Sequence, residues 1–418
     1  MRIPTSVGDA RDAVALRLAR RDHEKTLRTV EDGPWRSFEG LTRYSTVLAG
    51  IRPRHGTEPF VNVLLPEIGP SSYFAGVRTA LLVAAMTAKG LGRALRVISF
   101  GPLPRSGDEK WLAGAVASDL GTPLPAVELY SVWHVARESF STDDVWFATY
   151  WTTAHALDVA ARSGLLDPAR VVYLLQDYEA GFYPGSTVSA VVQSTYHAGF
   201  VPLVNSRPVA TTLERRAGLM VPSEQIFAPQ IDLTRLEAAS GLRTPDGPLR
   251  VGFYGRPSKP RNAFALGVAA LRSASARLKG PPDTVEFWSI GEKHNDAVLP
   301  GGRRLRSIGK VSWAGYFEQL AGFDVLLSLQ QSPHPSHPPL DMATLGGFAV
   351  MNDLEGTRSQ LSPRLIARAN DPDALAGGLV DVLANPALRE ARSFDPSLID
   401  VLGVPLDRAV HAVLQTLP

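Results

Sequence analysis

The residues best suited to chemistry lie in one stretch of the chain, Ser332–Asp353 (SPHPSHPPLDMATLGGFAVMND). Two imidazoles, His334 and His337, and one carboxylate, Asp341, lie close together in it. The prolines among them fix φ and remove amide donors, so we predict a stiff loop whose remaining N–H groups point in few directions. Imidazole nitrogens and free amides can hydrogen-bond a phosphate or a sugar hydroxyl. The alternative is a loop in which the histidines simply pack on the prolines.

The sequence around this loop predicts the elements that hold it in place. A buried strand at Phe323–Leu329 precedes the loop, and a short helix is predicted at Pro339–Leu345. Gly346 and Gly347 then end the helix before a strand at Phe348–Met351. A strand, a helix and a second strand in this length are typical of one βαβ unit of a parallel sheet. In such a sheet, anionic ligands bind at the carboxyl ends of strands and at the helix N-termini that follow.

A cluster of cations follows a second predicted strand, Leu249–Tyr254. Arg256, Lys259 and Arg261 come at its end, just before a helix predicted at Asn262–Leu278. Arginine offers a bidentate fork to a phosphate and lysine a point charge, so these side chains are candidates for a phosphate clamp. The alternative is an ordinary solvated basic loop.

Acidic and aromatic side chains follow a third predicted strand, Val171–Leu175. Asp177 and Glu179 come directly after it and are candidates for the general base of a transfer reaction, or for ligands of its acceptor. Tyr178, Phe182 and Tyr183 can stack on sugar rings, although a plain packing role is the better explanation for Phe182.

Weaker signals come from four further positions. Gly69 follows a predicted strand and lets the backbone approach a ligand. Glu292 also follows a strand and can accept hydrogen bonds from a nucleoside, although a surface acid is an equal alternative. The acid pair of Asp371 and Asp373 begins a predicted helix and is better explained as an N-cap.

Composition bounds the class of protein. The chain has 418 residues, which favours two domains. Its 43 Lys and Arg nearly balance 41 Asp and Glu, which argues against a nucleic-acid-binding protein. Cysteine is absent, which excludes disulfides and thiolate chemistry, and no set of metal ligands is evident. The first residues lack the apolar segment of a signal peptide, and no run is long enough to span a membrane. We therefore expect a cytoplasmic α/β protein.

Predicted strands and helices alternate along the chain, which favours doubly wound parallel sheets. Composition shifts at 232–248 (RTPDGP), the best candidate for a linker. We predict an N-terminal helical extension at 1–45, with its helix at about 8–28, and a Rossmann-like domain at 46–235. A second Rossmann-like domain at 236–400 and a helix at 401–418 that crosses back to the first complete the prediction. Two such domains facing a cleft would bind ligands between them.

An ordered set of motifs resembles the bacterial WsaF-like rhamnosyltransferases, which are glycosyltransferases of the GT-B fold. The motifs are QDYEAGFYP at 176–184, VGFYGRPSKPRN at 251–262, WSIGE at 288–292, SPHPS at 332–336 and PLDMA at 339–343. The resemblance covers residues 60 to 390. It implies a dTDP-β-L-rhamnose donor held by the C-terminal domain and an acceptor glycan held by the N-terminal domain.

The resemblance also assigns expected roles. In the wider family, a pair of glutamates eight positions apart brackets the helix, and the second contacts the ribose. Asp341 stands at the second position and is expected at the ribose, but Pro333 replaces the first acid, so the role of that first acid cannot be carried over. The amides of Leu340 to Ala343 are expected at the pyrophosphate. The expected catalytic residues are Asp177, Glu179 and His334, and the expected acceptor-binding residues are Gly69, Tyr178 and Tyr183. The expected donor-binding residues are Gly255, Arg256, Lys259, Arg261, Gly291, Glu292, Lys310, Val311, Ser336, His337, Asp341 and Met342.

The expected function is transfer of a deoxyhexose, L-rhamnose from its dTDP donor, to a glycan or polyprenyl-linked acceptor in bacterial surface polysaccharide synthesis. We expect no metal or other cofactor, no nucleic-acid partner and at most peripheral contact with the inner face of the membrane. Inverting transfer needs a general base, whereas retaining transfer in relatives is thought to use the donor phosphate. Two alternatives are a nucleotide-sugar 2-epimerase of the same fold, which calls for more acids and histidines, and a two-lobed sugar-binding protein, which normally carries an export signal.

Overall fold

The computed structural model describes residues 45–70, 72–73, 75–101, 107–242, 247–385, 388 and 392–418. The helix predicted at 8–28, and all of the extension that contains it except Ser45, lie outside these residues. The described residues form two compact units. The first comprises the described parts of Met1–Leu175, Tyr183–Leu203 and Val410–Pro418, and the second comprises Gln176–Phe182 and the described parts of Val204–Ala409.

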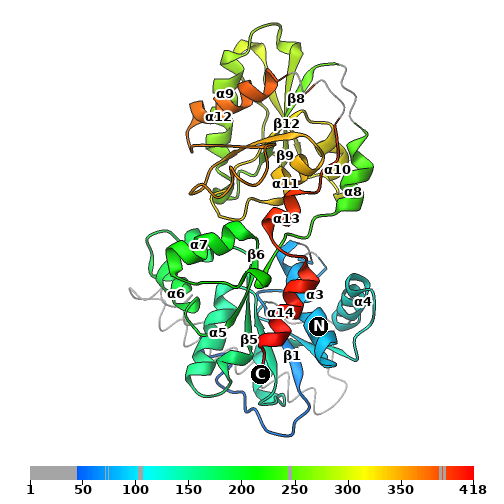
Figure 1. The fold of residues 1–418 in the computed structure, drawn as a ribbon, viewed down its shortest axis with the longest axis vertical. Coiled ribbons are helices and arrows are strands. Elements are labelled where there is room, and N and C mark those ends of the chain that lie inside the picture. Colours follow the sequence, from blue (N-terminus) through cyan, green and yellow to red (C-terminus); the bar gives the residue numbers. More distant parts are fainter. Residues whose placement is uncertain are drawn as a thin grey trace, which may run out of the picture. The chain divides into compact units, whose positions relative to one another are not determined.

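The first sheet has seven strands in the order β3-β2-β1-β4-β5-β6-β7. The pairs β1–β2, β2–β3, β1–β4, β4–β5 and β6–β7 are parallel. Its central strands read as continuous apolar runs because helices cover both faces of the sheet (Figure 1). The strands are β1 (Phe60–Leu65), β2 (Ala94–Ser99), β3 (Val127–Ser131), β4 (Val145–Ala148), β5 (Val171–Leu175), β6 (Val201–Asn205) and β7 (Ile226–Phe227).

In the part of the chain that the structure describes, six helices accompany the strands of the first sheet, and one of them, α7, falls in the second unit. Four of them were predicted from their apolar periodicity, as was the last helix of the chain. Helix α4 was missed because only Leu112 and Val116 of its residues are buried, too few for a clear apolar stripe. The helices are α3 (Ala75–Leu91), α4 (Asp108–Leu120), α5 (Trp151–Arg162), α6 (Thr187–Thr195), α7 (Arg207–Ala217) and α14 (Leu406–Thr416).

The second sheet also has seven strands, in the order β10-β11-β9-β8-β12-β13-β14. All its neighbours pair in parallel except β10 and β11. The strands are β8 (Leu249–Gly255), β9 (Val285–Gly291), β10 (Ala297–Val298), β11 (Arg304–Gly309), β12 (Val325–Leu327), β13 (Phe348–Asn352) and β14 (Leu365–Arg368). The helices are α8 (Leu233–Ser240), α9 (Phe264–Arg277), α10 (Trp313–Ala321), α11 (His337–Thr344), α12 (Pro372–Leu383) and α13 (Leu398–Leu402). The predicted fold class, two doubly wound α/β domains, is confirmed.

Two apolar clusters sandwich the second sheet. Strand β8 alternates between them, because Val251 and Phe253 pack in one cluster while Tyr254 packs against the other. Gly252 lies between these residues, where a Cβ would come within 2.4 Å of the Phe323 ring. The close packing of this central strand on both faces holds its carboxyl end firmly in place.

Several details of the sequence prediction were wrong. The range expected to be a linker contains helix α8, which Asp232 caps by accepting a hydrogen bond from the Arg235 amide at 3.2 Å. Its short length and few buried positions gave no periodic signal. Helix α11 begins at His337 rather than Pro339, since proline is tolerated in the first turn of a helix. Strands β7, β10 and β14 are only two to four residues long and were not predicted. Among the described residues, no helix combines the length and apolarity needed to cross a bilayer.

Candidate functional site

The second sheet has a topological switch point between β8 and β12. These strands are neighbours, but the chain runs from β8 through β9 to β11 on one side and from β12 through β13 to β14 on the other. In open α/β sheets, ligands bind outside the carboxyl ends of strands at such a point. The two loops that leave it, 256–262 after β8 and 328–336 after β12, carry the cations and histidines singled out in the sequence.

Buried hydrogen bonds join these two loops to each other. The Nδ2 of Asn262, a residue only 3% exposed, donates to the Oε1 of Gln330 at 2.9 Å and to the Leu329 carbonyl at 3.3 Å. The backbone N–H of Gln331 donates to the backbone carbonyl of Arg261 at 2.7 Å. The backbones of the two loops are therefore fixed relative to each other.

A fully buried arginine holds the loop after β12 from behind. Arg358 donates through Nη2 to the carbonyls of Gln330, at 2.8 Å, and Ser332. Through Nη1 it donates to the Asn352 carbonyl, at 2.6 Å, and to the amide oxygen of the same residue, at 3.0 Å. The loop is thus tied to the end of β13 as well as to β8.

His334 is held as a neutral hydrogen-bond donor. Its Nδ1 accepts the Ser336 N–H at 3.0 Å, so in the neutral ring the proton is on Nε2. Burial, the neighbouring His337 and the positive charges of Arg358 and Arg261 lower the pKa of His334 to about 3. The ring lies 5.9 Å from that of His337, centroid to centroid. A histidine in this state offers Nε2–H to a ligand but has no free basic nitrogen.

The turn into α11 is strained. Ser336 has φ 73° and ψ 155°, a conformation almost confined to glycine. Its N–H bond to His334 helps to hold that conformation. Because Pro338 and Pro339 have no N–H and the helix begins at His337, the first turn offers few free amides, and Met342 and Ala343 lie deeper in the helix. The expectation that the amides of Leu340 to Ala343 meet a pyrophosphate is therefore wrong for the later members of that run.

Asp177 lies against the loop after β12. Its Oδ2 accepts the Ser332 hydroxyl at 2.6 Å, and its Oδ1 accepts the Tyr178 amide at 2.9 Å. Burial raises the pKa of Asp177, which makes it a stronger base, although these hydrogen bonds and Arg261 oppose the shift. The Arg261 guanidinium in turn lies 5.1 Å from the centroid of the Phe182 ring.

The other residues predicted beyond β5 are placed differently. Glu179 is 6% exposed in a short 3₁₀ turn, Glu179–Phe182. Tyr178 as a whole is 5% exposed, with the Arg216 guanidinium 5.7 Å from the centroid of its ring. Tyr178 is therefore packed rather than open to a sugar ring on both faces. Both residues belong to the second unit.

Tyr183 and Gly69 belong to the first unit. The Tyr183 hydroxyl lies 2.7 Å from the Tyr150 hydroxyl and accepts a hydrogen bond from the Trp151 indole at 3.3 Å. Gly69 begins a turn after β1, and its carbonyl accepts the amide of Ser72 at 3.0 Å. The chain diverges in the first sheet between β1 and β4, so Gly69, Tyr150 and Trp151 follow the two strands of that sheet's own switch point.

Two residues predicted to bind the donor bind each other. The Glu292 Oε1 lies 3.4 Å from the Nε of Arg256 and accepts the Ser258 hydroxyl at 2.8 Å. Its Oε2 accepts the Ser258 amide at 2.9 Å, and the Ser258 bonds, with Arg256, lower the pKa of Glu292. Glu292 thus organises the start of the loop after β8.

Gly255 and Gly291 allow β8 and β9 to come close at their ends. A Cβ on Gly291, which has φ 120°, would lie 2.7 Å from the Gly255 carbonyl oxygen. A Cβ on Gly255 would lie 2.4 Å from the Ser289 hydroxyl. Lys259 and Arg261 are exposed residues of the loop that follows β8.

The remaining predicted donor residues lie around α10 and α11. Lys310 is exposed and Val311 half-buried just before α10. Asp341 is 4% exposed and accepts the Tyr316 hydroxyl at 2.7 Å, and burial raises its pKa to about 7. Met342 is fully buried in the apolar core, so its side chain contributes packing.

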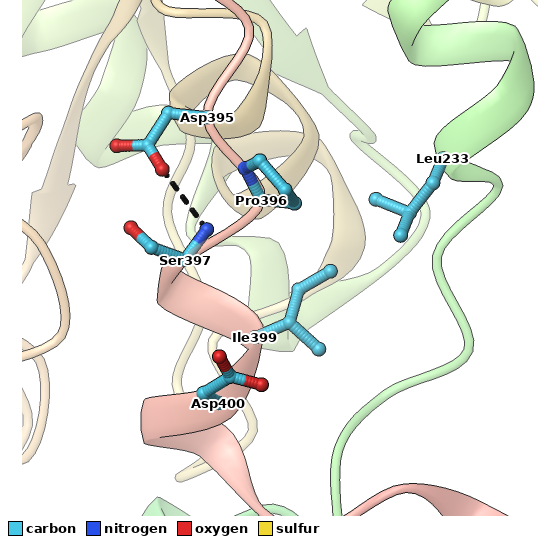
Figure 2. Close-up of a pocket in the computed structure, with 6 residues that line it drawn as sticks. All are labelled: Leu233, Asp395, Pro396, Ser397, Ile399 and Asp400. Atoms are coloured by element: carbon cyan, nitrogen blue, oxygen red, sulfur yellow. Dashed lines mark hydrogen bonds between the residues drawn. The ribbon is translucent and has the colours of Figure 1, made fainter.

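A separate pocket of about 460 Å³ lies in the second unit, at the start of α8 and around α13. Figure 2 shows Leu233 and Ile399 beside Pro396, with the carboxylates of Asp395 and Asp400 at its side. Asp395 accepts the Ser397 amide at 3.0 Å. None of these residues was predicted to be functional. In the described part of the chain, no group of three or more acidic or histidine side chains could hold a metal ion.

Sequence reasoning missed the residues that assemble the site. Asn262, Gln330, Ser332 and Arg358 act through hydrogen bonds to other segments, which no local pattern reports. Ser332 begins the stretch singled out in the sequence, but no role was predicted for its hydroxyl. Arg358 lies in a loop of turn-forming residues and gave no signal.

The chain matches both domains of WsaF. The WsaF N-terminal domain matches residues 60–207, and the WsaF C-terminal domain matches residues 249–380. The O-antigen biosynthesis protein RfbC of Myxococcus xanthus is 31% identical over 248 residues, which is 59% of this chain. The match covers 18% of RfbC, so this chain matches only a small part of that relative.

Solved structures with a similar fold are distant in sequence. Sucrose-phosphate synthase from Thermosynechococcus elongatus is 12% identical with a TM-score of 0.52, over 86% of this chain and 95% of that one. Anabaena Alr3699/HepE in complex with UDP-glucose is 14% identical with a TM-score of 0.52, over 86% and 99%. The UDP-forming trehalose-phosphate synthase of Burkholderia vietnamiensis is 12% identical with a TM-score of 0.52, over 86% and 98%. At such identities the likeness shows the fold, that of two parallel-sheet domains.

Proposed function

Because the chain belongs to the WsaF-like glycosyltransferases of the GT-B fold, we propose that it transfers a deoxyhexose from a nucleotide-sugar donor to a glycan or polyprenyl-linked acceptor. The proposed donor is dTDP-β-L-rhamnose, and the proposed pathway is bacterial surface polysaccharide synthesis. An O-antigen biosynthesis protein among the relatives supports that setting. A neighbour of similar fold with bound UDP-glucose supports a nucleotide-sugar donor.

One observation supports the proposed site above all others. Segments far apart in the sequence, at 176–182, 256–262 and 328–336, lie together at the switch point of the second sheet. They bring exposed cations, a neutral imidazole donor and a carboxylate to the sheet edge where anionic ligands bind. A diphosphate leaving group needs this combination, since its developing negative charge must be stabilised as the glycosidic bond breaks.

We assign the roles as follows. Lys259 and Arg261 attract and bind the diphosphate, with Arg256 joining them when it leaves Glu292. The Nε2–H of His334 donates to an oxygen of the donor. Asp177 or Glu179 accepts the proton of the acceptor hydroxyl if the transfer inverts configuration. Tyr183 contacts the acceptor, and no metal takes part. Action on the cytoplasmic side of the membrane remains a prediction from the sequence.

Nucleotide binding followed by product analysis tests this function. Calorimetry with dTDP, UDP and GDP should detect binding of at least one of them, whereas a carrier of free sugar binds none. Incubation with dTDP-rhamnose and a short rhamnan should then lengthen the glycan, which mass spectrometry detects. A new nucleotide-sugar epimer without glycan extension would instead identify an epimerase. Absence of all binding would refute the proposal.

A further inference from the structure

We infer that Arg358 is a positioning residue of the donor site: its guanidinium fixes the His334 loop and places a buried positive charge behind it that favours a bound diphosphate. The inference rests on the proposed function and adds a residue to it. It follows from three features of the structure, which are the geometry of the guanidinium, its electrostatic surroundings and the contrast with a second buried arginine.

The hydrogen bonds of the Arg358 guanidinium join the loop after β12 to the end of β13. The two terminal nitrogens of Arg358 donate to the carbonyls of Gln330 and Ser332, which lie beyond the carboxyl end of β12, and of Asn352, the last residue of β13. Asn352 reinforces this arrangement, since its Oδ1 accepts the Gln330 amide at 2.8 Å and its Nδ2 donates to the Gln330 carbonyl at 3.1 Å. Ser332, held in this way, donates its hydroxyl to Asp177. One side chain therefore holds the loop that carries both His334 and the Ser332 hydroxyl bonded to Asp177.

The charge of Arg358 is not cancelled by a direct carboxylate contact among its hydrogen bonds. Those bonds go to carbonyl and amide oxygens, and its Nε is buried without a partner in the described part of the chain. Burial lowers the pKa of Arg358 to about 10, against the attraction of Asp177 and Asp353. Arg261 and the N-terminus of α11 add further positive potential on the same side of the sheet. An anion bound there would be attracted by these two cations and by the helix N-terminus.

Arg303 is a matched counterexample in the same unit. It is 3% exposed, its Nε is also buried without a partner, and it also donates to carbonyls, those of Ser275, Gly280 and Pro281. Ser275 lies in the last turns of α9, where the helix dipole is negative and stabilises a cation. Arg303 therefore needs no anionic ligand to explain its charge. Arg358, by contrast, donates to carbonyls at the carboxyl edge of the second sheet, where helix α11 begins and presents the positive end of its dipole.

The test compares Arg358→Met, Arg358→Lys and Arg303→Met in the full chain. Titration calorimetry measures the affinity for whichever of dTDP, UDP and GDP binds the unmodified protein best. Hydrogen exchange measured by mass spectrometry reports the protection of residues 330–336. We expect Arg358→Met to weaken the diphosphate by about tenfold or more and to speed exchange in 330–336. Arg358→Lys keeps the charge but loses the fork, so it should weaken binding by about threefold.

Arg303→Met should leave affinity within about twofold of the unmodified protein and leave exchange in 330–336 unchanged, even if it lowers the melting temperature. Equal losses in Arg303→Met and Arg358→Met would overturn the inference, because both would then reflect general destabilisation. If Arg358→Met does not fold, Arg358→Lys decides, and unchanged affinity and exchange in that variant would overturn the inference. Failure of the unmodified protein to bind any of the three diphosphates would refute the proposed function itself, whereas binding that ignores Arg358 refutes only this inference.

Discussion

The two loops at the switch point of the second sheet have different construction. The loop after β12 is largely buried, and its His334 is neutral and held by Ser336, with Arg358 behind it. The loop after β8 exposes Lys259 and Arg261 and holds Arg256 in an ion pair with Glu292. The first loop is preorganised to present a hydrogen bond in one direction. The second can adapt its long cationic side chains to a ligand as it binds. Substitutions in the two loops should therefore differ in both the size and the kind of their effects.

The largest effect is expected at His334. Replacing it with leucine removes the Nε2–H donor, which should lower kcat for sugar transfer by about 100-fold, the typical cost of one preorganised donor. His334→Gln keeps an N–H donor and should retain more activity. Since the pKa of His334 lies at about 3, its ring should stay neutral from pH 8 to pH 5, and its contribution to the rate should not change over that range. Initial rates measured from pH 8 to pH 5 check this prediction. A rise in activity toward pH 5 that is absent from His334→Gln would contradict it.

The Asn262 side chain joins the two loops, so removing its hydrogen bonds should loosen the structure of both. Asn262→Leu leaves the Gln330 amide oxygen and the Leu329 carbonyl without their buried donor, at a cost of about 1–3 kcal/mol in the free energy of unfolding. Urea denaturation measures the change. A loss below about 0.5 kcal/mol would mean that the loops are fixed independently of this contact.

The buried carboxyl of Asp341 should make the stability of the fold depend on pH. Burial raises its pKa to about 7, above the value of about 3.9 for an unfolded aspartate. Ionisation therefore opposes folding, and the protein should lose stability relative to Asp341→Asn as the pH rises from about 4 to 7. At pH 8 the variant should be more stable, by an amount on the order of 4 kcal/mol, and near pH 4 this advantage should vanish. Thermal unfolding at both pH values checks the sign, and a difference independent of pH would contradict it.

A substitution of Lys259 tests the exposed loop after β8. Lys259→Ala should weaken diphosphate binding by about fivefold at low salt and by less at high salt, because solvent screens an exposed charge. Lys279→Ala, an exposed lysine beyond α9, is the matched control and should leave affinity unchanged. Calorimetry at two ionic strengths measures both variants. Salt-independent loss at Lys259 would place its charge in a desolvated contact instead.

The smallest effect is expected at Glu292. If it only organises the loop after β8, Glu292→Gln releases Arg256 while keeping an acceptor for Ser258, and diphosphate affinity should rise by no more than about twofold. If Glu292 instead contacts the nucleoside, as expected from the sequence, affinity should fall. The same titration with dTDP distinguishes the two roles.

The prediction from sequence succeeded where the signal was local and repeated. The alternation of apolar strands with amphipathic helices indicated two doubly wound sheets, and the βαβ unit around 332–353 is present as predicted, apart from the start of α11. It failed for α4 and α8, whose buried positions are too few to produce a period. It also failed to foresee that Arg256 and Glu292 pair, since each was read separately as a ligand of the donor.

By itself, the sequence determined which chemical groups follow which strands, and the regular order of elements determined that these groups collect at the carboxyl edge of a sheet. Proline content alone also indicated the stiffness of the His334 loop. Only the tertiary structure decided the protonation state of His334, the contact of Asp177 with Ser332 across 155 positions of sequence, and the role of Arg358. Burial and hydrogen bonds between distant segments set all three, and neither quantity is encoded in the neighbours of a residue along the chain.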